Sequence, residues 1–183
     1  MAGNKYGKYF AFGPLPEWAS IGHAGPTVAY ADDRLIKGCF CYSVSMVMPK
    51  PPKEWGKDEW GDIKHGTHQH EYAEVILHIG TNPDDPLDLG GEVEFCMGPE
   101  MEKHIISKSS VIYIPPNLEH GPWTVKRVER AFILAVIDQG PAHSEKSRPD
   151  LVSEQDRAKM VFIDEKLGGE KVMKIAGKKL KNF

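Results

Sequence analysis

The chain has 183 residues, of which 40% are hydrophobic and 27% charged, and its formal net charge at pH 7 is −3. This length and composition are typical of one soluble globular domain that can bury a sizeable core. So small a net charge gives no electrostatic reason to expect a nucleic acid or an anionic membrane as a partner. The three cysteines are an odd number and too few for a disulfide framework.

The sequence also lacks signals for export or membrane insertion. No apolar run approaches the length that is needed to cross a bilayer, and residues 1–5 do not begin the apolar core of a signal peptide. We therefore expect a cytoplasmic protein.

Short segments rich in β-branched and aromatic residues predict an all-β fold. They are separated by glycine, proline and other turn residues. Eight such segments follow one another, at residues 27–30, 35–48, 74–80, 92–97, 104–106, 111–114, 123–125 and 131–137. Many short strands with turns between them are typical of a sandwich or of a jelly-roll barrel.

The two ends of the chain differ in character from this central part. Residues 1–34 are rich in glycine, proline and aromatic side chains, and we interpret them as an N-terminal arm that packs on the barrel or on a partner subunit. Because an exposed aromatic arm is a hydrophobic liability, a homodimer is the expected assembly. The barrel is expected at residues 35–140. Residues 141–183 form a charged C-terminal extension, expected to be partly helical around residues 153–159, with Ser153 as the cap.

The most informative stretch is residues 67–74, which read Thr-His-Gln-His-Glu-Tyr-Ala-Glu. Residues two apart in a strand face the same side, so His68 and His70 can offer their imidazoles to one point. Glu74 cannot share that straight strand, since six residues at about 3.3 Å each would place it about 20 Å from His68. Metal–ligand bonds are only about 2.0–2.2 Å long. If Glu74 is a ligand, the chain must turn at residues 71–73 and begin a second strand at Glu74.

A third histidine, His120, follows the turn-forming sequence Ile-Pro-Pro-Asn-Leu-Glu at residues 114–119. It would have to reach the site from a third strand. Three imidazoles and one carboxylate suit a first-row divalent metal. We therefore predict one divalent transition metal per chain, bound by His68, His70, Glu74 and His120. These ligand types leave the metal open among Fe, Mn, Ni, Zn, Co and Cu.

This constellation resembles the two motifs of the cupin superfamily. The first has the form Gly-x5-His-x-His-x3–4-Glu-x6-Gly, and its ligand positions match His68, His70 and Glu74. The second has the form Gly-x5-Pro-x-Gly-x2-His-x3-Asn, in which Pro115 and His120 match. The resemblance covers residues 35–140. It implies a double-stranded β-helix, or jelly-roll barrel, with the metal inside it near one mouth.

The chain departs from these motifs at positions that are not ligands. Asp62 stands where the first glycine is expected, and the closing glycine, Gly80, comes one residue early. In the second motif, two glycines and an asparagine are replaced by Ser109, Asn117 and Thr124. Asn117 is a mild change, because asparagine tolerates the left-handed backbone that a turn needs. The departures leave the four ligand positions intact and point to no particular subfamily.

Other residues are weaker candidates for the site. Tyr72 lies in the expected turn between ligand strands, where it could supply a phenol as a catalytic base or pack at the rim. His78 shares the inward parity of Glu74 but lies about 13 Å further along the strand, so it is expected in the barrel lining or substrate pocket and not on the metal. Further candidates for the pocket, on strands of unknown facing, are His104 and Tyr113. Expected outside the site are His23, His65 and His143.

The resemblance implies a metal-dependent enzyme that acts on a small, oxygen-rich organic substrate chelated to the metal. Its reaction would be that of a dioxygenase, lyase, decarboxylase or isomerase. The alternative is a non-catalytic cupin that binds a metal or small ligand, as a sensor or storage module. A purely structural jelly roll would leave four ligand-type residues unexplained. The expected partners are a small molecule and a second copy of the chain, with no nucleic acid and no membrane.

Overall fold

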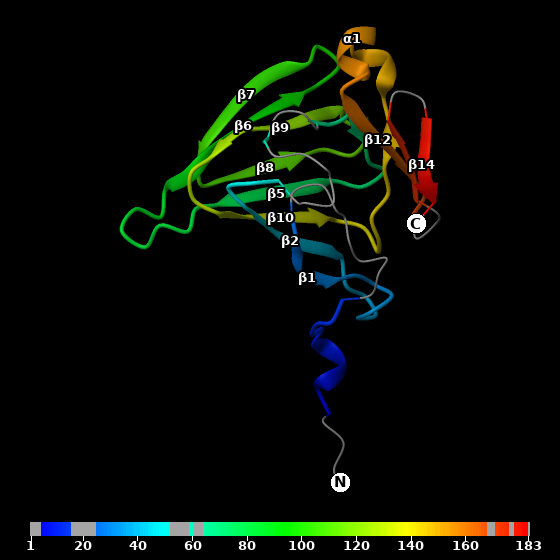
Figure 1. Cartoon of the computed structure of the whole chain (residues 1–183). Helices are drawn as coiled ribbons and strands as arrows, with labels where there is room; N and C mark the ends of the chain where they lie inside the picture. The colour runs from blue at the N-terminus through cyan, green and yellow to red at the C-terminus, as the bar shows by residue number, and fades with distance from the viewer. Residues whose placement is uncertain are drawn as a thin grey trace.

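Two mainly antiparallel β-sheets form the computed structural model of the chain (Figure 1). The structure describes residues 5–15, 25–51, 59–60, 64–167, 171–175 and 178–182. The first sheet has the strand order β1 (Thr27–Ala31), β2 (Cys41–Val47), β10 (Phe132–Asp138), β5 (Glu74–Ile79), β8 (Ser110–Ile114).

The second sheet brings together histidines that are far apart in the sequence. Its strand order is β11 (Lys146–Ser147), β4 (His68–Gln69), β9 (His120–Val128), β3 (Lys64–His65), β12 (Met160–Glu165), β13 (Lys171–Ile175), β14 (Lys178–Asn182). The long strand β6 (Asp88–Met97) pairs with β9 and with β7 (Glu102–Lys108). In this arrangement His68 on β4 lies directly opposite His120 on β9.

The core lies between the two sheets, as the alternating burial of the strands requires. Along β5 every second side chain is buried, from Glu74 through Ile76 to His78. Strand β2 alternates in the same way. Large apolar side chains from both sheets, including Phe132 and Phe95, fill the space between them.

The strand pairing confirms the all-β jelly-roll barrel that the sequence predicts. A described strand lies in each of the eight predicted segments, and between β4 and β10 the chain repeatedly crosses from one sheet to the other. The second segment is shorter than expected, because a turn precedes the start of β2 at Cys41. The buried carboxylate of Asp32 holds this turn by accepting hydrogen bonds from the backbone N–H groups of Arg34 and Leu35.

The C-terminal extension is mainly strand, and its expected helical character is limited to one turn. Helix α1 has four residues, Glu154–Arg157, and the Ser153 hydroxyl caps it by accepting from the backbone N–H of Asp156. A 3-10 turn, Pro149–Leu151, precedes the helix. Strand β11 pairs with β4, and β12 runs parallel to β3. The extension therefore adds strands to the sheet that carries the histidines.

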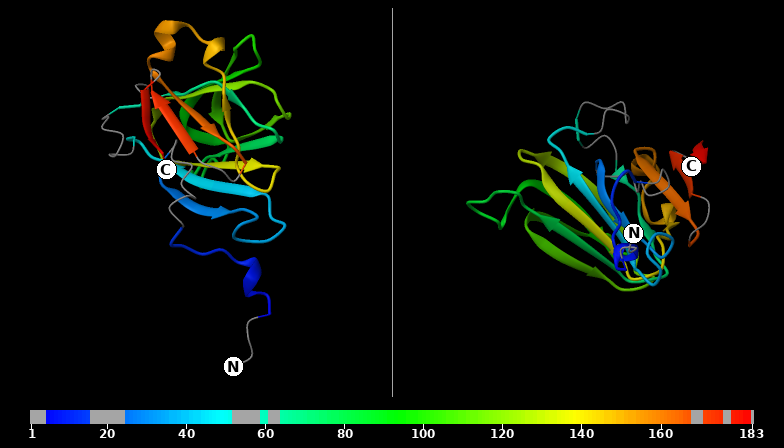
Figure 2. Two further views of the ribbon diagram at one scale, coloured as in Figure 1. Left: turned by 90° about the vertical axis from the view of Figure 1, so that its right-hand side faces the viewer. Right: turned by 90° about the horizontal axis from the view of Figure 1, so that it is seen from below.

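Residues 25–34 of the N-terminal arm include β1, which belongs to the first sheet. The earlier described part of the arm, residues 5–15, extends away from the sheets (Figure 2), contains a 3-10 helix, Gly7–Tyr9, and contacts Tyr30 and Cys41 through Leu15. Its aromatic side chains are exposed, with 57% of Tyr9 and 81% of Phe12 accessible to solvent. The homodimer that would bury them stays a prediction. In the described part of the chain, no helix is long and apolar enough to cross a membrane.

The turn between β8 and β9 depends on Asn117, whose φ of 61° lies in the left-handed region. Asparagine is one of the few residues with a side chain that adopt this region readily. The backbone N–H of Asn117 donates a hydrogen bond of 2.9 Å to the carbonyl of His70. The turn thus ties the approach to His120 directly to the chain at His70.

Substitution of Asn117 tests this role of the turn. We expect Asn117→Gly to leave stability nearly unchanged, because glycine adopts a positive φ without strain. Asn117→Val should lower the free energy of unfolding by about 1–2 kcal/mol, the cost of a left-handed conformation for a residue with a Cβ. Urea denaturation followed by tryptophan fluorescence measures both variants. Equal stabilities would contradict the assignment.

Candidate metal centre

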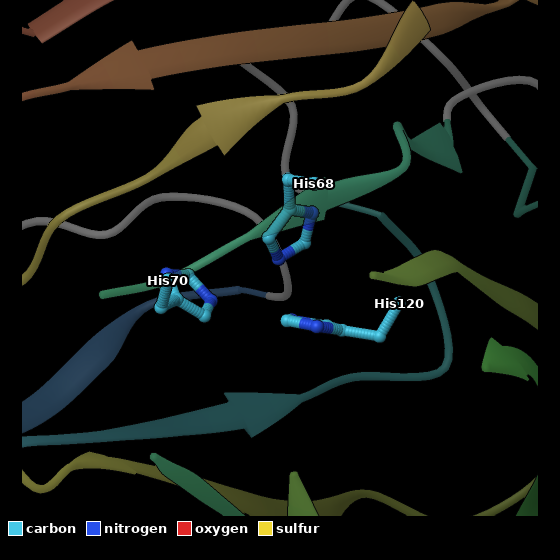
Figure 3. Close-up of side chains that lie close together, drawn as sticks. All are labelled: His68, His70 and His120. Atoms are coloured by element: carbon cyan, nitrogen blue, oxygen red, sulfur yellow. The ribbon is translucent and has the colours of Figure 1, made fainter. Parts of the chain in front are cut away.

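Three imidazoles meet at one end of the space between the sheets. They belong to His68 on β4, His70 just after it, and His120 at the start of β9 (Figure 3). One nitrogen from each ring lies within 4.8 Å of the others, and all three side chains are buried. The turn expected at residues 71–73 is present, and Glu74 begins β5 beside them.

Each imidazole is oriented by a backbone carbonyl. The Nδ1 atom of His68 donates to the carbonyl of Gly66 at 2.7 Å, and that of His120 donates to Leu118 at 2.9 Å. The Nδ1 atom of His70 donates to the carbonyl of Ser144 in the C-terminal extension. Because a carbonyl only accepts, this arrangement fixes the proton on Nδ1 and leaves Nε2 available as a metal ligand.

The atoms that would touch a metal lack hydrogen-bond partners. Within the described part of the chain, the Nε2 atoms of His70 and His120 and the Oε2 atom of Glu74 are buried and unpartnered. Glu74 Oε2 lies 3.6 Å from His70 Nε2 and 3.2 Å from His120 Nε2. Ligand atoms bonded at about 2.1 Å to one ion lie roughly 3 Å apart, so these separations fit a shared cation.

The electrostatics of three of the four side chains also suit a cation. Burial lowers the pKa of both His68 and His70, which keeps these imidazoles neutral. Burial opposes ionisation of Glu74, but the neighbouring imidazoles of His70 and His120 outweigh it and hold the pKa of Glu74 below its usual range. Burial also lowers the pKa of His120, yet the adjoining Glu74 carboxylate raises it overall. Neutral imidazoles and an ionised carboxylate are the states that bind metals, and His68, His70 and Glu74 are in those states. The shift of His120 favours its protonated form, so metal binding there would displace a proton.

Two histidines that were expected outside the site, His65 and His143, lie beside it. His65 Nε2 is 2.7 Å from Glu145 Oε1, and the His65 ring stacks on His68 with centroids 4.3 Å apart. The His143 ring lies 5.1 Å from that of His70. The prediction for these two residues was wrong because the extension folds back, with Ser147 pairing against His68 and Val161 against His65.

His65 and His143 belong to a second group of buried or partly buried side chains, in which hydrogen bonds connect His65, Glu145, His143 and Asp138 in that order. His143 Nδ1 is 3.0 Å from Asp138 Oδ2, and His143 Nε2 is 3.4 Å from Glu145 Oε2. Burial opposes both charges, but Asp138 and Glu145 raise the pKa of His143. The imidazoles of His65 and His68, followed by that of His143, lower the pKa of Glu145. The His-x-Glu spacing at residues 143–145 repeats the spacing of the ligand pair, and it is the signal in the sequence that could have drawn attention to this segment.

Other combinations of these residues could also hold a metal, namely His65 with His68 and Glu145, or His70 with Asp138 and His143. In each, an imidazole already has a hydrogen bond to a carboxylate, although Asp138 Oδ1 has none. His70 Nε2, Glu74 Oε2 and His120 Nε2 have no hydrogen-bond partner and are close to one another, so their desolvation is offset only by ion pairs of 3.2–3.6 Å. This difference favours the centre at His68, His70, Glu74 and His120.

The remaining predicted site residues lie away from the ligands. The Tyr72 ring packs over Gly140, where a Cβ would come within 2.4 Å of it, and Tyr72 is partly exposed. Tyr113 is 57% exposed and His104 is also exposed, because both point outward from their strands. Their assignment to the substrate pocket is corrected accordingly. His23 lies outside the described residues.

His78 faces inward, as its parity predicts, but behind the lining of the site and not in it. It is fully buried, and its Nε2 accepts a hydrogen bond of 3.0 Å from the indole N–H of Trp123. Trp123 in turn lines a cavity of about 70 Å³ next to the four ligands. A larger, charged cleft of about 620 Å³ lies on the other side of His70, against the C-terminal extension.

Comparison with solved structures gives distant similarities. A conserved double-stranded β-helix protein of uncharacterised function from Klebsiella pneumoniae is 12% identical, with a TM-score of 0.40, over 66% of this chain and 75% of that one. An oxalate decarboxylase of Bacillus subtilis is 12% identical, with a TM-score of 0.46, over 75% of this chain but 32% of its own. A DMSP lyase of Ruegeria pomeroyi is 15% identical, with a TM-score of 0.35, over 59% of this chain and 42% of that one. Identities this low bear on the fold alone.

Double-stranded β-helix proteins are thus among the structural neighbours, as the resemblance to cupins implies. No protein-family model matches the sequence. A search of curated proteins also gives no match.

The buried imidazole of His78 predicts a pH dependence of stability. Burial lowers its pKa to about 4, below the ordinary value of 6.5. Between pH 6.5 and pH 4, His78 is protonated in the unfolded chain but stays neutral in the folded protein. The free energy of unfolding therefore falls as pH decreases from 6.5 towards 4. The loss attributable to His78 should be roughly 3 kcal/mol, at about 1.36 kcal/mol per pKa unit.

Urea unfolding of the metal-free protein between pH 7 and 4, compared with His78→Gln, measures this contribution. Glutamine can still accept from Trp123 but does not titrate. The wild-type protein should lose more stability than the variant across this interval. Parallel pH profiles would show that His78 does not contribute.

Proposed function

We propose that this protein is a mononuclear metal-dependent enzyme that acts on a small, oxygen-rich organic substrate. The ligands would be His68, His70, Glu74 and His120. The observation that carries the proposal is the meeting of buried, unpartnered ligand atoms from three strands around one position. In a purely structural barrel this arrangement would only be destabilising, since each unpaired buried polar group lowers the stability of the folded state by about 1–3 kcal/mol.

A divalent metal, when bound, would supply Lewis acidity towards a substrate oxygen, or redox chemistry if it is Fe, Mn, Ni, Co or Cu. Four protein ligands leave positions open for a substrate. The carbonyls of Gly66, Leu118 and Ser144 hold the imidazoles in place, and the adjoining cavity is lined mainly by apolar atoms. A dioxygenase, lyase, decarboxylase or isomerase reaction is compatible with the proposed metal, its four ligands and the adjoining cavity.

The alternative is a metal- or ligand-binding protein without catalysis. The small volume of the cavity, about 70 Å³, suits storage or sensing of a small molecule as well as its conversion. The two functions share a metal centre and differ in turnover.

Metal content tests the centre itself. We expect the wild-type protein to bind about one divalent ion per chain, and His70→Ala and His120→Ala to lose most of it, since each removes one of four ligands. His104→Ala is the matched control, because His104 is an exposed histidine that points away from the site. Elemental analysis of dialysed protein provides the measurement, with circular dichroism to confirm folding. Equal metal content in all four proteins would refute the centre.

A turnover screen separates the enzyme from the binding protein. Forms loaded with Fe, Mn, Ni or Zn are incubated with catechols, diketones and hydroxy acids, while O₂ uptake and substrate loss are recorded. Uptake that requires Fe or Mn and disappears in His120→Ala supports an oxygenase, and substrate loss without uptake supports non-redox chemistry. Tight binding of a compound without its conversion would favour the sensor or storage function.

A further inference from the structure

The cavity beside the ligands has one polar end and one apolar end. Its polar end is formed by the four proposed ligands. From Glu74 the lining continues along the first sheet, where β5, β10 and β2 pair in register. The row next to Glu74 contains Ser43, Val136 and Ile76, and the following row contains Ser45 and Leu134.

The opposite wall comes from the second sheet and is aromatic. Phe95 on β6 and Trp123 on β9 line this side. The indole N–H of Trp123 is already used, because it donates to His78. Ser43 and Ser45, on the wall formed by the first sheet, are neutral. Their hydroxyls could accept a hydrogen bond from a hydroxyl group of a ligand but could not balance a charge.

The described lining residues of the cavity include no lysine or arginine. Its two imidazoles that are not proposed ligands, those of His65 and His143, already face the Glu145 carboxylate. A charged group at the apolar end would therefore be buried without a counter-ion. Such burial costs several kcal/mol even after the protein relaxes.

The size of the cavity also limits its occupant. A volume of about 70 Å³ is several times the roughly 10–15 Å³ that one water needs. It is well below the roughly 300–1,000 Å³ of pockets that hold drug-sized molecules. The larger cleft behind His70 touches none of the other three proposed ligands, so the small cavity is the one that opens onto the centre.

We propose that this cavity selects short-chain 2-hydroxy monocarboxylates, with the carboxylate and hydroxyl at the metal end and a short alkyl group among Ile76, Leu134 and Val136. It should reject dicarboxylates, whose second carboxylate would lie at the apolar end. The inference rests on the proposed metal centre and assigns a substrate class to it.

Two acids with the same metal-binding head test this selection. Hydroxymalonate and 2-hydroxy-3-methylbutanoate have the same number of non-hydrogen atoms, but one carries a second carboxylate where the other has an isopropyl group. Calorimetric titration of the zinc-loaded wild-type protein, in which the metal is redox-inactive, measures binding without turnover. Titration of free zinc gives the reference order, in which the dianion is expected to bind more tightly.

The expected result is a reversal of that order, with the monocarboxylate bound at least tenfold more tightly by the protein. Val136→Phe, which fills the apolar end, should weaken the monocarboxylate at least tenfold while zinc content stays unchanged. Zinc binding with hydroxymalonate preferred, or with neither acid bound, would overturn the substrate class and leave the metal centre standing. A wild-type protein that binds no zinc or other divalent ion would overturn the centre itself. The wild-type comparison stands even if Val136→Phe does not fold.

Discussion

The proposed site depends on the desolvation of three ligand atoms that lie close together without hydrogen-bond partners. The Nε2 atoms of His70 and His120 and the Oε2 atom of Glu74 are all buried at the end of the barrel. Each unpaired buried polar group costs about 1–3 kcal/mol, and a shared divalent cation would remove the cost of all three together. The chain turns at residues 71–73 and 115–119 so that three strands can deliver these atoms to one point.

The C-terminal extension is part of this arrangement and not an appendage to it. Its β11 strand pairs with β4, so the carbonyl of Ser144 reaches the Nδ1 atom of His70. Glu145 Oε1 comes within 3.7 Å of the Nδ1 atom of His68. Carbonyls and carboxylates behind ligand imidazoles orient the rings and raise their basicity, which strengthens metal binding. The extension therefore acts on the proposed centre through His68 on β4 and His70 just after it.

Much of the site could be predicted from the sequence because it depends on local rules. The two-residue spacing places His68 and His70 on one side, and the length of a strand requires the turn before Glu74. The left-handed turn at Asn117 could also be predicted from the sequence, since few other residues adopt that conformation. These rules need no knowledge of which strands pair.

The parts that were mispredicted depend on long-range pairing or on strands without alternation. The placement of His65 and His143 beside the ligands follows from the contacts of the extension with β3 and β4, which no local pattern encodes. Tyr113 belongs to the all-apolar sequence Val-Ile-Tyr-Ile at residues 111–114, where inward and outward positions cannot be distinguished by polarity. His104 belongs to β7, in which only Ile106 is buried. The facing of such strands is decided by the partner sheet.

The central claim is that His68, His70, Glu74 and His120 together hold one metal ion. Anomalous diffraction from crystals of the metal-loaded protein, collected at the absorption edge of the bound metal, tests it most directly. We expect a single peak about 2.0–2.2 Å from one nitrogen of each of the three imidazoles and from a carboxylate oxygen of Glu74. A peak between His65 and Glu145, or between His143 and Asp138, or no peak in protein that had been supplied with metal, would contradict it.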